Sequence, residues 1–163
     1  MELKKTNFGR EGTVFFKLYN KDIDISLDDG VTDEYAEKCV EAMNNMPGET
    51  IDVICRAAKA YCLKYKELLT DDDFNEFMTI PFTSETPAKE ILKCFGITGL
   101  AVEIPKDDTK IGYQLGGWCD WDIEHGIEID ILDDKVVFLS SFDGCSPWRE
   151  YNDTDEWNFV NFI

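Results

Sequence analysis

Two consecutive segments with helical spacing, flanked on both sides by alternating residues, constrain the fold of this chain most. Over 33–46 and 49–69, apolar residues recur every three or four positions, so each segment has one apolar face. Thr32 and Thr70 precede acidic residues in the manner of helix N-caps, and Pro47 separates the two helices. Strand-like regions around such a helical pair predict an α+β fold, an antiparallel sheet with two or three helices packed on one face.

The first alternating region, residues 13–27, predicts a β-hairpin. Asn20 and Lys21 are expected to form a two-residue turn between its strands. The pairs that follow from this turn are Leu18 with Ile23, Phe16 with Ile25 and Val14 with Leu27. All six apolar side chains then lie on one side of the hairpin.

The second alternating region predicts three or four strands between residues 100 and 139, after a short helix over 86–95. The aromatic tail, 141–163, is expected to pack against the domain. The sequence contains no internal repeat, and its length suits one domain over 1–163, with the loop 79–86 as the best candidate for a joint.

An excess of acidic residues limits the partners of this chain. Its 34 Asp plus Glu against 16 Lys plus Arg give a formal charge of −18. This charge repels phosphate backbones and anionic membranes, so it excludes both as partners and favours a cationic protein. No signal sequence or bilayer-length apolar run is present, and we expect a cytoplasmic protein. Six cysteines without a paired spacing are then expected to be reduced core thiols.

The motifs of common enzyme classes are absent from the sequence. It has no phosphate-binding loop, no dinucleotide glycine fingerprint and no nucleophile elbow. Its single histidine, His125, excludes a multi-histidine metal site and is expected to be a hydrogen-bonded, partly buried structural residue. We therefore expect a binding protein rather than an enzyme, with no catalytic residue, cofactor or metal.

Acidic residues alternate with other residues after position 119. If 120–131 is extended, one side of the strand carries Asp120, Asp122, Glu124, Glu128 and Asp130. A calcium loop is disfavoured because His125 stands where that loop needs glycine. The row is also too dense to single out the two carboxylates of a glycosidase. Two interpretations remain, a solvated strand face and a docking surface for a basic protein that includes the five acids and Trp121.

A short motif around these acids carries a family resemblance. The segment Trp121-Asp122-Ile123-Glu124-His125-Gly126, followed by apolar alternation and the Asp133-Asp134 turn, resembles the W-D-x-E-H-G signature of a bacterial family of uncharacterised small domains. Relatives of that kind are similar to immunity proteins of polymorphic-toxin and contact-dependent-inhibition systems. The resemblance covers residues 96–142 and implies a cytoplasmic α+β binding protein.

Charge and resemblance together predict an immunity protein that neutralises a basic, nuclease-like toxin domain by occlusion. An acidic antidote would associate rapidly with a cationic toxin and cover the surface that holds nucleic acid. Two other interpretations stay open: a housekeeping or scaffold domain whose acidity serves solubility, and a small hydrolase or metal-dependent enzyme centred on Glu124 and His125.

Overall fold

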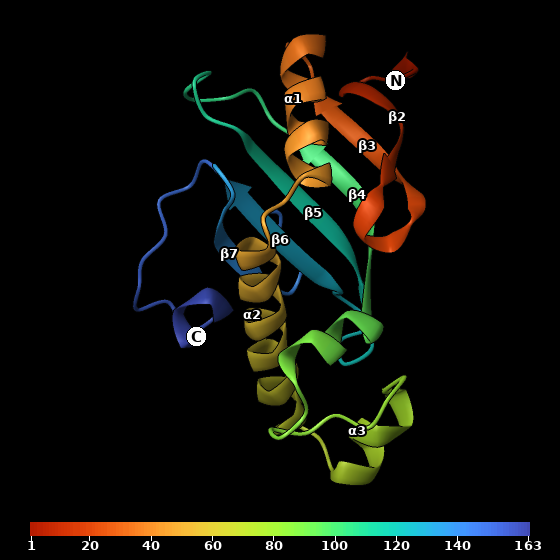
Figure 1. The fold of residues 1–163 in the computed structure, drawn as a ribbon, viewed down its shortest axis with the longest axis vertical. Helices are drawn as coiled ribbons and strands as arrows, with labels where there is room; N and C mark the ends of the chain where they lie inside the picture. Colours follow the sequence, from red (N-terminus) through yellow and green to blue (C-terminus); the bar gives the residue numbers. More distant parts are fainter.

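The computed structural model describes residues 1–163 and contains one seven-stranded sheet (Figure 1). Its strands are β1 Leu3–Lys5, β2 Gly9–Phe16, β3 Lys21–Asp28, β4 Phe95–Val102, β5 Gly112–Cys119, β6 Ile127–Leu132 and β7 Lys135–Ser140. They lie in the sheet in their order along the chain. Every neighbouring pair is antiparallel except β3 and β4, which are parallel. The predicted α+β fold is confirmed, with this one parallel pair as an exception to the antiparallel sheet.

The helices lie in the connection between β3 and β4, because parallel neighbours need a long crossover. They are α1 Asp33–Asn44, α2 Gly48–Lys66, α3 Asp71–Phe77 and the 3₁₀ helix η2 Ala88–Lys93. The hydroxyls of Thr32 and Thr70 accept backbone N–H groups at 3.2 Å each, which confirms both predicted caps. Figure 1 shows α1 and α2 lying across one face of the sheet, with α3 beyond its end. None of these helices combines the length and apolar character that a bilayer crossing requires.

The hydrophobic core fills the space between α1, α2 and the sheet. Alternate residues of the strands, such as Ile23, Ile25 and Leu27 on β3, point into it. All six cysteines are buried with free thiols, as the sequence predicts. Burial raises the pKa of the Cys119 thiol to about 12, so this thiol stays protonated at neutral pH.

The predicted hairpin forms with a different register. Val14 pairs with Ile23 and Gly12 with Ile25, so the expected pairing of Phe16 with Ile25 is wrong by four residues along the strand, although both side chains are buried in the core. The connection is longer than two residues because the 3₁₀ helix η1, Lys17–Tyr19, precedes Asn20. Asn20 adopts left-handed backbone angles, which asparagine tolerates better than most residues.

The aromatic tail packs only in part. Trp148 and Phe159 are buried, whereas Phe142, Trp157 and Phe162 are exposed. Asn158, just before the 3₁₀ helix η3 Phe159–Phe162, accepts the N–H of Leu139 at 3.2 Å and donates to the carbonyl of Val137 at 2.8 Å. The tail thereby satisfies backbone groups on the outer edge of β7, and this edge is protected from pairing with another strand.

Candidate functional site

The sheet face away from α1 and α2, called the open face below, carries the main groove of the molecule. The groove has a volume of about 1300 Å³ and runs across β1–β5. Its floor contains small residues at the strand positions that point away from the core, namely Thr13, Ser26, Gly99, Ala101 and Gly116. Because few side chains rise from this floor, an extended chain can approach the backbone of the sheet closely.

Exposed acids follow the open face on β3. Asp22, Asp24 and Asp28 alternate with the core residues of this strand, and all three are exposed. Glu11 on β2 is also exposed and lies on the groove, where Lys4 of β1 is its strand partner. Acidic residues at alternate strand positions therefore do form an exposed row, but this row lies on β3.

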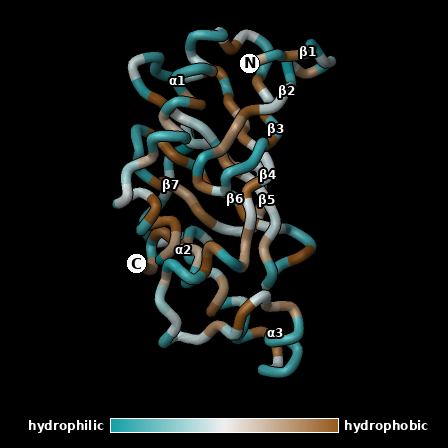
Figure 2. The backbone as a smooth tube through the Cα atoms, turned by 45° about the vertical axis from the view of Figure 1, so that its right-hand side comes forward, coloured by the Kyte–Doolittle hydropathy of each residue, from teal (hydrophilic) through white to brown (hydrophobic).

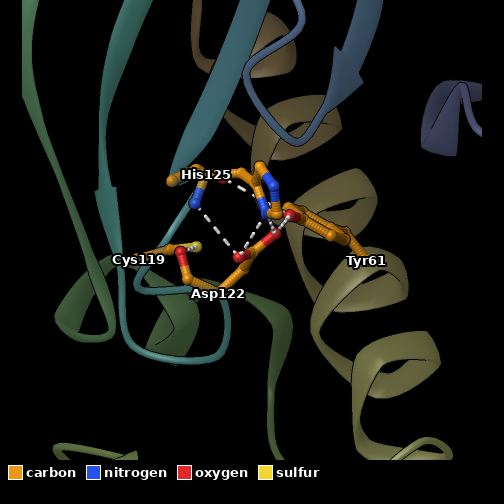
Figure 3. A network of polar contacts seen from close by, with 5 residues as sticks. Tyr61, Cys119, Asp122 and His125 are labelled. Atoms are coloured by element: carbon orange, nitrogen blue, oxygen red, sulfur yellow. Dashed lines mark hydrogen bonds and ion pairs between the residues drawn. The ribbon is translucent and has the colours of Figure 1, made fainter.

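The W-D-x-E-H-G segment is a tight loop, 120–126, at the end of β5 rather than part of a strand (Figure 3). Asp122 lies at its centre and is only 3% exposed. Its carboxylate accepts the Tyr61 hydroxyl at 2.7 Å and the His125 backbone N–H at 3.1 Å, while His125 Nδ1 lies 3.0 Å from Oδ1. Burial opposes ionisation, but these hydrogen bonds outweigh it and hold the pKa of Asp122 below its usual value.

Trp121 and Gly126 of this segment also hold the loop closed. Trp121 is buried with its ring centroid 5.4 Å from that of Tyr61. Gly126 has a φ of +69°, and a Cβ there would lie 2.1 Å from the carbonyl oxygen of Gly117, so only glycine fits. Tyr61, Trp121, Asp122 and Gly126, called the lock below, therefore fix the conformation of the loop. Ile123 and Glu124 stay exposed at its tip.

His125 differs from the expected partly buried residue, because its side chain is 58% exposed. The expected hydrogen bond is present, since Nδ1 faces both carboxylate oxygens of Asp122, at 3.0 and 3.2 Å. With a proton on Nδ1, the neutral ring keeps Nε2 as an acceptor. No hydroxyl or thiol of the chain hydrogen-bonds to this second nitrogen, and Cys119 donates instead to the Asp122 carbonyl at 3.6 Å.

Glu128 and Asp130 are fully buried, which contradicts their predicted place on an exposed row. They point to the open face, but residues 141–151, called the strap below, cross this part of it. Glu128 accepts three consecutive backbone N–H groups of the strap, from Asp143 at 2.9 Å, Gly144 at 2.8 Å and Cys145 at 2.7 Å. A carboxylate on the sheet thus anchors the strap through its backbone.

Asp130 lies next to Glu128 in a group of side chains with more acceptors than hydrogens. The Gln114 amide nitrogen has two hydrogens but faces Glu128 at 3.1 Å, Asp130 at 3.0 Å and the Cys145 carbonyl at 2.7 Å. The single Tyr151 hydroxyl hydrogen faces Asp130 at 2.9 Å and the Ser146 carbonyl at 2.8 Å. A proton on Asp130 supplies the missing donor. Burial and the charge of Glu128 accordingly raise the pKa of Asp130 to about 7.

The sequence of the chain matches one known protein family over most of its length. Residues 1–146 match the family described as Domain of unknown function (DUF6985). The chain belongs to the DUF6985 family. The matched residues include all seven strands, the groove, the 120–126 loop and the three strap residues that bind Glu128. No curated protein and no solved structure matches this DUF6985 domain.

Some of the predicted contact residues of the DUF6985 domain are exposed, and others are buried. Glu124 is exposed, and Asp120 is half-buried with its carboxylate accepting the Thr79 N–H at 2.7 Å. Trp121 and Asp122 are buried in the lock, and Glu128 and Asp130 are buried beneath the strap, so none of these four can contact a partner in this structure. Sequence reasoning missed the open-face acids of β3, although the alternation of that strand contained them.

We expect His125→Ala to lower the free energy of unfolding of the DUF6985 domain by about 1 kcal/mol, because a partly exposed hydrogen bond to a buried carboxylate is lost. The Tyr61 and backbone hydrogen bonds to Asp122 remain in this variant. Urea unfolding measures the effect, with Ile123→Ala at the exposed tip as the matched control. A loss of partner capture without any loss of stability would assign His125 a direct functional role instead.

Proposed function

We propose that this DUF6985 domain is an immunity protein that binds a basic toxin domain through its open face and neutralises it by occlusion. The observation that carries the proposal is the uncovered sheet face with a groove and the exposed acids Asp22, Asp24 and Asp28. A sheet face of this kind can bury a large area without rearrangement of the fold. The charge of −18 would steer a cationic partner to it.

The similarity of the W-D-x-E-H-G signature to immunity proteins supports the same function. In this proposal the signature builds the loop at one end of the groove, and the contacts with the toxin come from exposed residues around it. Neutralisation then requires coverage of the nucleic-acid-binding surface of the toxin and no reaction. The strap and the lock keep the binding surface in one conformation before the partner arrives, which reduces the entropy lost on binding.

A small hydrolase remains the second candidate because of one observation, the buried Asp122 carboxylate against His125 Nδ1. This arrangement orients a histidine as a general base, and Glu124 is exposed next to it. In such an enzyme the nucleophile would be a water molecule or a group of the substrate. Hydrolysis that persists in the purified protein and disappears in His125→Asn at full stability would favour this candidate.

A test of the immunity function compares two neutralised variants of equal charge. Asp22, Asp24 and Asp28 are changed together to asparagine on the open face, and Asp71, Asp72 and Asp73 are changed together to asparagine on α3. All six residues are exposed, and Figure 2 shows α3 at the opposite end of the molecule from β1, β2 and β3. Both triple variants remove three negative charges, and the α3 variant also removes the ion pair of Asp71 with Lys66, which lies far from the open face.

The partner in this test is the basic toxin domain encoded by the neighbouring gene. We expect the open-face variant to capture this toxin domain about tenfold more slowly at low salt, with the dissociation rate little changed. The α3 variant should slow capture much less, and the difference should shrink as salt shortens the Debye length to about 8 Å at 0.15 M. Stopped-flow association measures both, and co-expression with the toxin tests protection of growth. Equal slowing in both variants, or rates indifferent to salt, would contradict binding at the open face.

A further inference from the structure

Trp118 lies flat on the open face at one end of the groove. Its strand partner is Gly96, and a Cβ on Gly96 would lie 2.7 Å from Nε1 and 2.8 Å from both Cε2 and Cζ2 of the indole. These nearly equal distances show that the ring lies directly over the Gly96 backbone, in space that any other residue would fill. The side chain is nevertheless 47% exposed and lines the groove, so part of the indole is accessible to a ligand.

Other exposed side chains surround this indole. Phe142 of the strap is 51% exposed, and its ring lies 3.6 Å from the Cβ position of Gly116, two residues before Trp118 on the same strand. The base of the loop lies against the Trp118 backbone, since the Cβ position of Gly126 lies 3.5 Å from the Trp118 Cα. Ile123 and Glu124 at that tip line the same groove. An exposed indole, two apolar side chains and one carboxylate therefore line the same groove.

We propose that Trp118 and Glu124 form a subsite for an arginine side chain of the protein partner. The proposal rests on the immunity function above and specifies its contact. A guanidinium group stacks on an indole face through its planar, weakly hydrated surface and pairs with a carboxylate through its N–H groups. The small residues of the groove floor leave room for the backbone that carries this arginine. Charge complementarity favours a cation here, because the domain has a net charge of −18.

The first test uses a small probe and the intact domain. Acetyl-Gly-Arg-Gly-amide is titrated while NMR follows the indole N–H resonances, with that of Trp118 assigned through Trp118→Phe. We expect the Trp118 resonance to shift with saturation, whereas that of Trp157, which is 64% exposed outside the groove, stays in place. The corresponding norleucine peptide should produce no saturable shift, and the lysine peptide should bind more weakly than the arginine peptide.

Variants then separate the two parts of the subsite. Glu124→Gln should weaken binding of the arginine peptide about threefold, while Glu37→Gln on the exposed face of α1 leaves binding unchanged. Trp118→Ala should weaken it about tenfold, and Trp157→Ala should have no effect. An equal response to the norleucine peptide, or an unchanged Trp118 resonance with arginine, would overturn the subsite.

Kinetics with the toxin domain distinguish failure of the subsite from failure of the proposed function. If the open-face variant slows capture but Trp118→Ala leaves the dissociation rate unchanged, the immunity function stands and the arginine subsite is wrong. If Trp118→Ala speeds dissociation about tenfold and Trp157→Ala does not, both proposals are supported. If the arginine peptide binds but the toxin is not captured at all, the immunity function is wrong and only the subsite chemistry stands.

Discussion

Glu128→Ala should lower the free energy of unfolding by about 3–5 kcal/mol, because a fully buried carboxylate that satisfies three backbone N–H groups is removed. Those N–H groups of the strap would then lack a partner, and the Gln114 amide would lose one acceptor. We expect the strap to open more often than the rest of the domain. Its amides at 143–145 should exchange with solvent rapidly in the variant, even where the rest of the sheet stays protected.

Urea unfolding and amide hydrogen exchange measure this effect, and Glu124→Ala is the matched control because its side chain is exposed on the same segment of chain. Added formate should restore part of the stability of Glu128→Ala, since a small carboxylate can occupy the vacated site and accept the same N–H groups. A loss of stability no larger than that of Glu124→Ala would show that the strap does not depend on this anchor.

The contrast between β3 and β6 shows why the sequence alone could not predict which acidic residues are exposed. On both strands, acidic residues alternate with isoleucine or leucine, and this pattern predicts acids that face solvent. Asp22, Asp24 and Asp28 are exposed as the pattern predicts, whereas Glu128 and Asp130 are buried. The difference arises from the strap, which crosses β6 and not β3. A contact between segments distant in sequence leaves no trace in the local period of either strand.

Local rules succeeded wherever the contacts were local. The N-caps Thr32 and Thr70 bond to residues three positions away, so their residue types were sufficient to place both helices. The hairpin register was missed because Asn20 was assigned to a two-residue turn, although a left-handed asparagine after a 3₁₀ turn is itself a known local solution. For residues 120–126, the Asp122 side chain and Gly126 override the alternation that suggested a strand.

For the candidate site, the sequence predicted the exposure of some residues and not of others. Net charge and the W-D-x-E-H-G segment indicated an acidic binding domain, and Glu124 was correctly expected at an accessible position. Trp118 could not be identified as exposed, since tryptophan in a strand is more often in the core. Its exposure depends on Gly96 of the neighbouring strand, and that pairing is visible only once the sheet is assembled.

Stability should fall as the pH rises from about 4 to about 7, because the folded protein holds a proton on Asp130 that the unfolded chain releases earlier. The pKa of Asp130 is raised to about 7 by burial and by the charge of Glu128, against about 3.9 in an unfolded chain. Between these two values the folded state binds more protons, so the contribution of this group to stability is complete below pH 4 and lost above pH 7. The shift corresponds to about 2–4 kcal/mol.

Asp130→Asn should remove this dependence and make the domain more stable than the natural protein at pH 8. An asparagine keeps the shape, accepts from Gln114, and donates a hydrogen to Tyr151 without a charge beside Glu128. The measurement is urea unfolding from pH 4 to pH 8, with Asp24→Asn as the control because that carboxylate is exposed on β3. Glu103, whose charge also raises the pKa of Asp130, contacts the Ser146 hydroxyl at 2.6 Å and remains unchanged. If Asp130→Asn were instead less stable than the natural protein at pH 8, the folded state would favour an ionised carboxylate over a neutral group at this position, which would contradict a raised pKa of Asp130. Another group would then have to donate the hydrogen bond that Gln114 and Tyr151 lack hydrogens to make.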